Sequence, residues 1–288
     1  MNVTKIASLG EYLAKVSELR DVWQTKDDRE LWFRGESEIR PTTLQPTLYR
    51  PRKDPKNIGA YLPLKPISKL LKIELDLYEE FQRRAIQLCD EKINEDDWDW
   101  DSYFLMQHHY APTRLLDWSD GSLMGLHFAI RSKDRDDKKD AIVYVLEPYK
   151  LMKRMDALTE RKKSKEAWAK YLAKHPDDDL TDDDWDVNYL PSDRGLKLPL
   201  LPLLLEFPHF TRRVAAQRSR FMLFGRSHDW LAKEAKKKNS PIHGITIDAN
   251  SVPKIRRDLR EGGVTEAVIF PDLDGLGREL KQLWVERR

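Results

Sequence analysis

Hydrophobic residues recur every three or four positions in several parts of the chain, and this spacing predicts helices. Residues 8–24 show it first, with Ser8 placed to cap the helix start. A second helix is predicted over residues 67–92, with Cys89 at its end. Further helices are predicted from near Asp97 with Tyr103, Phe104 and Met106 turned inward, and over residues 121–130 and 251–263. A last helix is predicted in the C-terminal part of residues 265–284, with Asp272 and Asp274 in a cap or turn before it.

Short apolar runs rich in β-branched and aromatic residues predict strands between these helices. The clearest is AIVYVLEP, which is closed by a proline. The predicted strands lie near residues 30–34, 141–146, 219–224, 243–248 and 266–270. We therefore expect an α+β fold, with a central mixed or antiparallel sheet flanked by helices. Residues 1–288 are expected to form a single domain, in which 150–195 is a charged, helical insertion.

Composition narrows the class of protein. Hydrophobic residues make up 40% of the chain, enough for a core. The 51 basic and 49 acidic side chains leave a net charge of +2, which gives no global case for nucleic-acid binding. Cys89 is the single cysteine, so an internal disulfide framework is excluded and a cytoplasmic protein is expected. We expect no secretion signal and no membrane association, because the first residues lack a signal pattern and no apolar run approaches about 20 residues.

The segment QHHYAPTRLLDWSDGSLMGLHFAI, residues 107–130, places polar groups capable of chemistry among apolar residues. Such a pattern is typical of a binding pocket on a rigid scaffold, and also of a buried ion pair. His108 and His109 point about 100° apart on a helix, so they cannot chelate one metal together. No spacing in the chain supports a metal site.

Four segments resemble the FRG domain family, which takes its name from a Phe/Tyr-Arg-Gly motif. They are LWFRGES at 31–37, QHHYAPTRLLDWS at 107–119, AAQRSRFMLFG at 215–225 and GVTEAVIFPDLDGLGREL at 263–280. The resemblance runs in order along the chain and implies an FRG core over residues 28–283. The chain departs from the family pattern in having two adjacent histidines, and a serine rather than a threonine at position 119.

The aromatic-Arg-Gly strand also resembles, more faintly, the first motif of Arg-Ser-Glu ADP-ribosyltransferases. That resemblance implies an ADP-ribosyltransferase-like fold with NAD as cofactor, and Arg34 would hold the NAD phosphates. Thr113 or Ser119 would supply the supporting hydroxyl. Gln217 stands near the position of the family's glutamate, and the chain has no Glu-x-Glu there. The resemblance therefore implies NAD binding more strongly than it implies the transfer step.

The candidate catalytic residues are His108 as a base or ribose ligand, with Asp117 and Gln217 orienting the attacking group. Ligand binding is assigned to Arg34, Gly35, Thr113, Arg114 and Ser119. Structural alternatives stay open: Arg34 could close a turn by pairing with Asp117 or a carbonyl, and Arg114 could pair with Asp117 in the interior.

The function expected from these features is that of an NAD-using, ADP-ribosyltransferase-like effector of the toxin or phage-defence type. It would act on a nucleotide or a macromolecule, with an antitoxin or other defence protein as a partner. One alternative is a non-catalytic module that binds a nucleotide or phosphate. Another is an effector that binds nucleic acid through residues 232–238 and the basic stretch Arg212, Arg213, Arg218 and Arg220, which could equally be a solvated strand edge.

Overall fold

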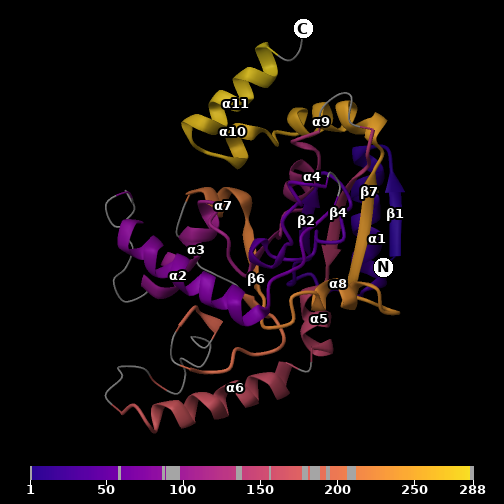
Figure 1. Cartoon of the computed structure of the whole chain (residues 1–288). Coiled ribbons are helices and arrows are strands. Elements are labelled where there is room, and N and C mark those ends of the chain that lie inside the picture. The colour runs from indigo at the N-terminus through magenta and orange to yellow at the C-terminus, as the bar shows by residue number, and fades with distance from the viewer. Residues whose placement is uncertain are drawn as a thin grey trace.

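The computed structural model describes residues 2–57, 60–85, 88, 98–133, 138–155, 157–176, 181, 189–192, 195–205 and 212–285 (Figure 1). Its strands are β1 (Asn2–Ile6), β2 (Trp32–Glu36), β3 (Leu115–Ser119), β4 (Ala141–Leu146), β5 (Leu203–Leu205), β6 (Ser219–Leu223) and β7 (Ile242–Ile247). The α-helices are α1 (Leu9–Val22), α2 (Ile67–Ala85), α3 (Trp98–His108), α4 (Ser122–Ile130), α5 (Pro148–Arg154), α6 (Ala157–Leu172), α7 (Arg212–Gln217), α8 (Trp230–Ala235), α9 (Val252–Glu261), α10 (Glu266–Ile269) and α11 (Leu273–Trp284). Short 3₁₀ turns are η1 (Thr47–Tyr49) and η4 (Ala249–Ser251).

The strands form one seven-stranded sheet in the order β1-β7-β4-β2-β3-β6-β5. β1 pairs with β7 in parallel, and the other neighbours pair antiparallel, so the sheet is mixed. This confirms the predicted α+β class with a central sheet flanked by helices. None of the helices in the described part of the chain combines the length and apolar character needed to cross a bilayer.

Several local predictions are confirmed. Ser8 caps α1 by accepting a hydrogen bond from the Glu11 amide at 3.2 Å. Asp272 caps α11 by accepting from the Gly275 amide at 2.6 Å. α3 turns its predicted aromatic and methionine side chains inward. The predicted start of α3 near Asp97 and the end of α2 with Cys89 lie outside the described residues.

Other local predictions are wrong. Residues 266–270 are not a strand: Thr265 caps the short helix α10, and the Glu266 carboxylate is buried among cations. Residues 115–119, for which no strand was predicted, form β3, and α4 begins only at Ser122. The edge strands β1 and β5 were not predicted, because β1 has a mostly exposed pattern and β5 is very short.

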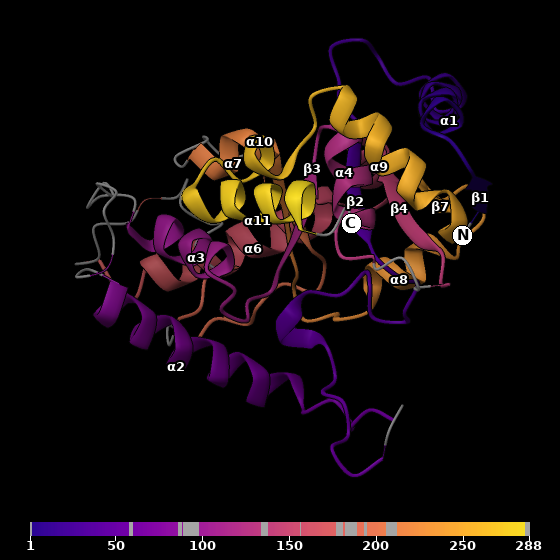
Figure 2. The same cartoon turned by 90° about the horizontal axis from the view of Figure 1, so that it is seen from above.

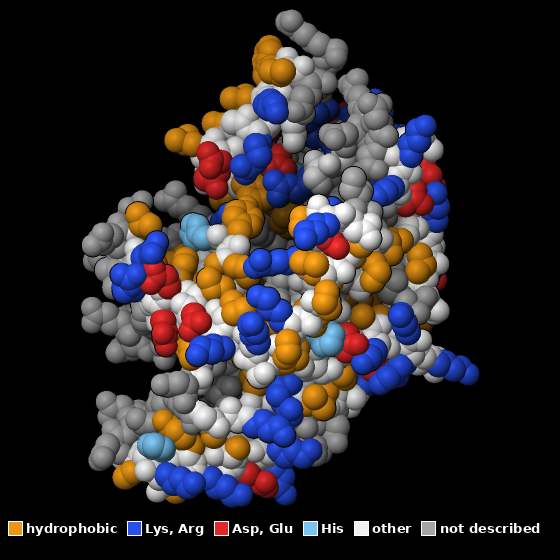
Figure 3. All heavy atoms as spheres, in the orientation of Figure 1, with side chains coloured by type: hydrophobic (Ala, Val, Ile, Leu, Met, Phe, Trp, Pro, Cys, Tyr) orange, Lys and Arg blue, Asp and Glu red, His pale blue; other side chains and the backbone are white. Residues whose placement is uncertain are grey.

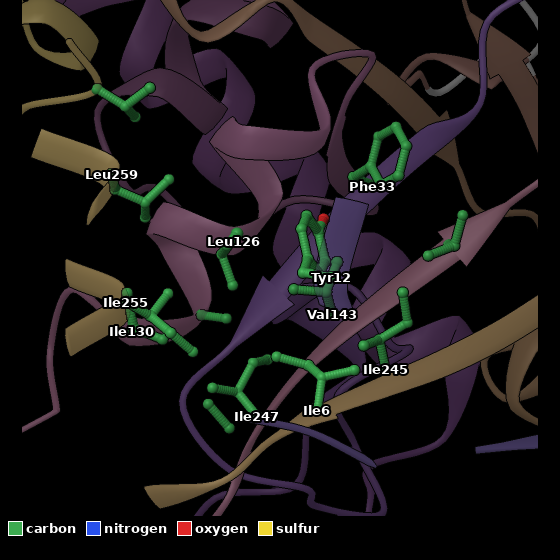
Figure 4. Close-up of a cluster of buried hydrophobic side chains, with 14 of the residues drawn as sticks. Ile6, Tyr12, Phe33, Leu126, Ile130, Val143, Ile245, Ile247, Ile255 and Leu259 are labelled. Atoms are coloured by element: carbon green, nitrogen blue, oxygen red, sulfur yellow. The ribbon is translucent and has the colours of Figure 1, made fainter. Parts of the chain in front are cut away.

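Helices cover both faces of the sheet. On one face α1, α4 and α9 enclose a core that includes Tyr12, Leu126 and Ile255, packed on Phe33 and Val143 (Figure 4). On the other face, α5, α8 and the start of α2 cover Trp32, Ile142 and their neighbours. Figure 2 shows α1 and α2 on opposite sides of the molecule. At the β3-β6-β5 end, α2 and α3 pack in a third cluster.

The helix α4 lies unusually close to β2 because glycines face each other across the contact. A Cβ built on Gly35 would lie 2.1 Å from the Gly125 carbonyl oxygen and 2.3 Å from the Ala129 nitrogen. A Cβ on Gly125 would lie 2.6 Å from the Phe33 Cβ. Gly35 was expected to let a ligand approach the backbone, but the backbone of α4 fills the space where its Cβ would be.

Replacement of Gly35 by alanine is expected to destabilise the fold by at least about 2 kcal/mol, because α4 must move away from β2. Gly10→Ala is the matched control. Gly10 lies in α1 with nothing within 4 Å of its virtual Cβ. That variant should be stabilised by about 0.5–1 kcal/mol through helix propensity. Urea melts of both variants check the prediction, and equal stabilities would contradict it.

Candidate functional site

The candidate site lies where two neighbouring strands of the sheet part. β2 and β3 pair at one position, Phe33 with Ser119, whereas β2 pairs with β4 at five positions and β3 with β6 at five. Beyond that single pair, the Arg34 side chain reaches across and donates to the Asp117 carbonyl at 2.8 Å. A guanidinium therefore satisfies a strand carbonyl that no β2 amide reaches.

A cleft of about 370 Å³ opens at this place and is here called the central cleft. Its floor comes from β2, β3 and β6, and its walls come from α3, α4, α7 and the residue after α10. In Figure 3 the surface below α11 is hollowed, with hydrophobic side chains at the bottom. The polar residues that line the cleft are Arg34, Thr47, Gln107, His108, Asp117, Ser119, Arg131, Arg213, Gln217 and Ser219.

A chain of hydrogen bonds fixes the Asp117 carboxylate. The Thr113 hydroxyl accepts from the Leu115 amide at 3.1 Å and donates to the Gln107 side-chain carbonyl at 2.5 Å. This fixes the Gln107 amide so that its NH₂ group donates to Asp117 at 2.7 Å. Solvent reaches the carboxylate from the cleft, while protein surrounds it elsewhere. Although the residue is exposed to the cleft, the surrounding protein still removes part of the water around its carboxylate. This desolvation raises the pKa of Asp117 above its usual range, and the Arg34 charge offsets only part of the rise.

His108 presents a neutral imidazole to the cleft. Burial, followed by the nearby Arg213 and His109, lowers the pKa of His108 to about 4. Its Nε2 atom is buried and has no hydrogen-bond partner among the described residues. A buried ring nitrogen without a partner is costly, so a group of a bound ligand would stabilise it.

Arg213 is the cationic group of the cleft with the most unused donor capacity. Its Nη2 donates to the Tyr110 hydroxyl at 2.9 Å, and its guanidinium lies 4.9 Å from the centre of the Phe270 ring. Its Nε is buried without an acceptor, and within the described ranges no carboxylate forms an ion pair with it. Arg131 stacks on the other side of the site, 4.3 Å from the Phe270 ring, but is paired with Glu266 at 3.2 Å.

Arg34 and Ser119 line the cleft with most of their polar atoms already engaged. Arg34 also donates to the Thr43 carbonyl at 3.3 Å and pairs with Glu36, and its side chain is 12% exposed. The Ser119 hydroxyl donates to the Gln217 carbonyl at 2.7 Å and accepts from the Gly121 amide at 3.1 Å. Arg34 therefore matches the turn-closing alternative, while its edge still faces the cleft.

With this geometry in place, comparison with known proteins identifies the family. Residues 29–138 match the family model described as the FRG domain. This part of the chain carries an FRG domain. No curated protein and no solved structure matches the chain. The FRG match covers β2, α3 and β3, whereas Arg213, Gln217 and Phe270 complete the cleft from beyond the matched span.

Arg114 of the FRG motif is structural in its contacts. Its side chain is 1% exposed and pairs with the Glu74 carboxylate of α2 at 2.5 Å. It also donates to the carbonyls of Phe224, at 2.9 Å, and Tyr189. The alternative in which Arg114 pairs with Asp117 is therefore wrong, and the predicted contact of Arg114 with a ligand does not fit its burial. Thr113, which is also fully buried, supports the cleft through Gln107.

The basic stretch beside the FRG motifs is divided rather than gathered into one patch. Arg213 faces the cleft, while Arg218 and Arg220 both reach the Asp120 carboxylate. The side chain of Arg212 lies outside the described residues. Gln217, at the end of α7, lines the cleft and donates to the Ile269 carbonyl at 3.4 Å. In the described part of the chain, His, Cys, Asp and Glu form no group of three or more suited to a metal ion.

The structure thus brings six of the predicted site residues to one cleft: Arg34, Gly35, His108, Asp117, Ser119 and Gln217. Thr113 and Arg114 lie behind it. Sequence reasoning missed Gln107 and Phe270 as site residues, although both stand inside the motif segments that carry the resemblance. It placed Arg213 with a nucleic-acid surface, because a basic run does not reveal which of its members turns inward.

Removal of the Arg114 charge is expected to cost about 3–5 kcal/mol of unfolding free energy, because it leaves the buried Glu74 carboxylate without its partner. Arg114→Met tests this in a urea melt. The double variant Glu74→Gln/Arg114→Met should recover a large part of the loss, because no stranded charge remains. A single variant as stable as wild type would contradict the assignment of Arg114 to the scaffold.

The stability contribution of Asp117 is expected to depend on pH. Folding raises its pKa, so the neutral carboxyl is favoured in the folded state. This stabilisation is complete below the unfolded pKa of about 3.9 and is lost as the pH rises through the folded value. Asp117→Asn should therefore gain stability relative to wild type between about pH 4 and pH 7.

Urea melts across this pH range, with Asp76→Asn on the exposed side of α2 as the control, check the sign. A difference between Asp117→Asn and wild type that shrinks as the pH rises would show that the carboxylate is the favoured form.

Proposed function

We propose that the central cleft binds NAD or a closely related dinucleotide, and that the chain is an ADP-ribosyltransferase-like effector. The observation that carries this proposal is the meeting, in one cleft, of a poorly satisfied guanidinium, an oriented carboxylate and a neutral imidazole whose Nε2 has no partner among the described residues. These groups come from segments about 100 residues apart, Gln107–Asp117 and Arg213–Gln217. The cleft volume of about 370 Å³ lies within the range of small-molecule sites.

The anionic part of the ligand is assigned to Arg213. Its planar guanidinium can donate two parallel hydrogen bonds to a phosphate, and its Nε has no competing acceptor among the described residues. Arg131 adds positive charge across the Phe270 ring, although Glu266 already pairs with it. Arg34 was expected to hold the NAD phosphates, but its donors hold Glu36 and two carbonyls. The phosphate contact therefore passes to Arg213 in this proposal.

Two groups fit the ribose and the planar ring. The free Nε2 of His108 can exchange a hydrogen bond with a sugar hydroxyl, in the tautomer that suits it. Tyr110, 77% exposed at the rim, offers an aromatic face on which a planar ring can stack. The residues present thus fit the parts of a dinucleotide.

NAD would supply an ADP-ribosyl group: the bond from its ribose to nicotinamide breaks with the electron pair leaving on nicotinamide, and the acceptor's nucleophile forms the new bond and releases a proton. Asp117 is placed to accept that proton, because Gln107 orients its carboxylate and its raised pKa makes it a better base than an ordinary aspartate. Gln217 lies in the same cleft and can orient the acceptor through its amide.

The effector role, of the toxin or phage-defence type, is proposed on the resemblance stated above, together with a cytoplasmic location and an antitoxin or other defence protein as partner. The second candidate function is a module that binds a nucleotide or phosphate without turning it over. The commitment of the Arg34 donors, and a glutamine in place of a Glu-x-Glu motif at Gln217, favour this second candidate.

Arg213→Ala is expected to raise the Kd for NAD at least about tenfold, since a charge-assisted hydrogen bond contributes about 1.5–3 kcal/mol. Arg218→Ala is the matched control, because this arginine lies five positions away, is exposed, and pairs with Asp120. It should bind NAD within about twofold of wild type. Calorimetric titration of the three proteins measures the difference. No saturable NAD binding to wild type would contradict the proposal.

Label transfer separates the two candidate functions. Wild type incubated with labelled NAD and a cell extract should transfer label, and Asp117→Asn should bind NAD but lose transfer. Saturable binding without transfer by wild type would support the binding module instead.

A further inference from the structure

A second and larger cleft lies between α9 and α11 and has no role in the function proposed above. It measures about 760 Å³ and is lined by the end of α4, by α9, and by the facing sides of α10 and α11. Figure 1 shows α9 and α11 side by side at one end of the molecule, and Figure 3 shows Lys and Arg side chains in this region. It is here called the basic cleft, after Arg131, Lys133, Arg256, Arg257 and Arg260.

The charge of the basic cleft is strongly positive. Its five cationic residues face two acidic ones, Glu266 and Glu279. Glu266 is already neutralised, since it contacts His127 at 3.0 Å, Arg131 at 3.2 Å and Arg278 at 3.1 Å. Burial alone would raise the pKa of Glu266, but these partners lower that pKa to about 2. Glu279 accepts from the Ala267 amide at 2.8 Å.

The arginines of α9 divide into one that builds the cleft and two that remain open to it. Arg256 donates to the carbonyls of Ile130, at 2.6 Å, and Lys133, at 2.8 Å, so it ties α9 to the end of α4. Arg257 is exposed and Arg260 is half-buried, and neither forms an ion pair with an acidic residue in the ranges that the structure describes. Two guanidinium groups three positions apart lie on neighbouring positions of the helix surface.

The lining residues also indicate which anion fits. Phe, Tyr and Trp are absent from the described lining, so a base has no aromatic ring on which to stack. Guanidinium groups match phosphate oxygens with parallel hydrogen bonds, and contacts to phosphates alone carry no sequence information.

We propose that the basic cleft binds the phosphodiester backbone of a nucleic acid without sequence preference. Arg131 lines both clefts, so a strand held here would lie next to the central cleft. The nucleic acid would then be the acceptor of the transfer reaction, an inference that rests on the proposed function. The binding of nucleic acid to the basic cleft does not rest on that function. This surface differs from the basic stretch at residues 212–220, whose Arg218 and Arg220 are held by Asp120.

The test measures binding of fluorescein-labelled 20-nucleotide single-stranded RNA and of duplex DNA by anisotropy, over a series of salt concentrations. Arg257→Glu/Arg260→Glu should weaken binding at least about tenfold near 0.1 M salt. Arg257→Gln/Arg260→Gln, a milder change, should lower the salt slope by about 1 to 2. Thermal melts of both variants establish that they fold.

The control is Lys236→Glu/Lys238→Glu, which makes the same change of charge in the exposed loop before β7. This loop lies at the opposite end of β7 from α9, away from the basic cleft. It should bind nucleic acid within about twofold of wild type. NAD titration of the α9 variants should give the wild-type Kd, which separates this site from the central cleft.

Three results would overturn the assignment. One is loss of nucleic-acid binding in the lysine control with retention in the α9 variants. Another is binding of inorganic pyrophosphate but of neither oligonucleotide, which would indicate a small-anion site. The third is equal competition by poly-glutamate, which would indicate an acidic protein partner.

Discussion

The buried ion pair of Glu74 and Arg114 joins the parts of the molecule that the central cleft requires. Glu74 also accepts from the Arg114 amide at 3.0 Å and from the Tyr103 hydroxyl, so one carboxylate connects α2, α3 and the start of β3. The other Arg114 donors hold carbonyls after β6 and in the segment before β5. A charge so deeply buried is stable only if every donor is used, and this requirement fixes the spacing of these elements.

That scaffold explains why the cleft can hold polar groups in defined positions. With α3 and the start of β3 held together, Thr113 orients Gln107, and Gln107 orients Asp117. On the other side, Gly35 and Gly125 bring α4 against β2, which places Arg131 at the edge of the same cleft. Within one motif, TRLLDWS, the scaffold residues Thr113 and Arg114 thus come directly before the cleft residues Asp117 and Ser119.

The sequence predicted the elements whose signals are local and missed relationships between distant segments. Ser8 and the apolar spacing after it defined α1, and the run AIVYVL defined β4, because capping and periodicity are properties of short windows. The partner of Arg114 was missed, because Glu74 lies 40 residues away and appears in the sequence as one polar residue of an amphipathic helix. The role of Arg213 was likewise hidden, because burial of one arginine in a basic run depends on packing.

The central claim is that Arg114 builds the cleft while Arg213, His108 and Asp117 face the ligand. A crystal structure of the chain with NAD tests it most directly. The account predicts the pyrophosphate beside the guanidinium of Arg213, a ribose hydroxyl at the Nε2 of His108, and Arg114 still covered and paired with Glu74. A pyrophosphate bound in the basic cleft alone, or an Arg114 that leaves Glu74 to contact the ligand, would contradict it.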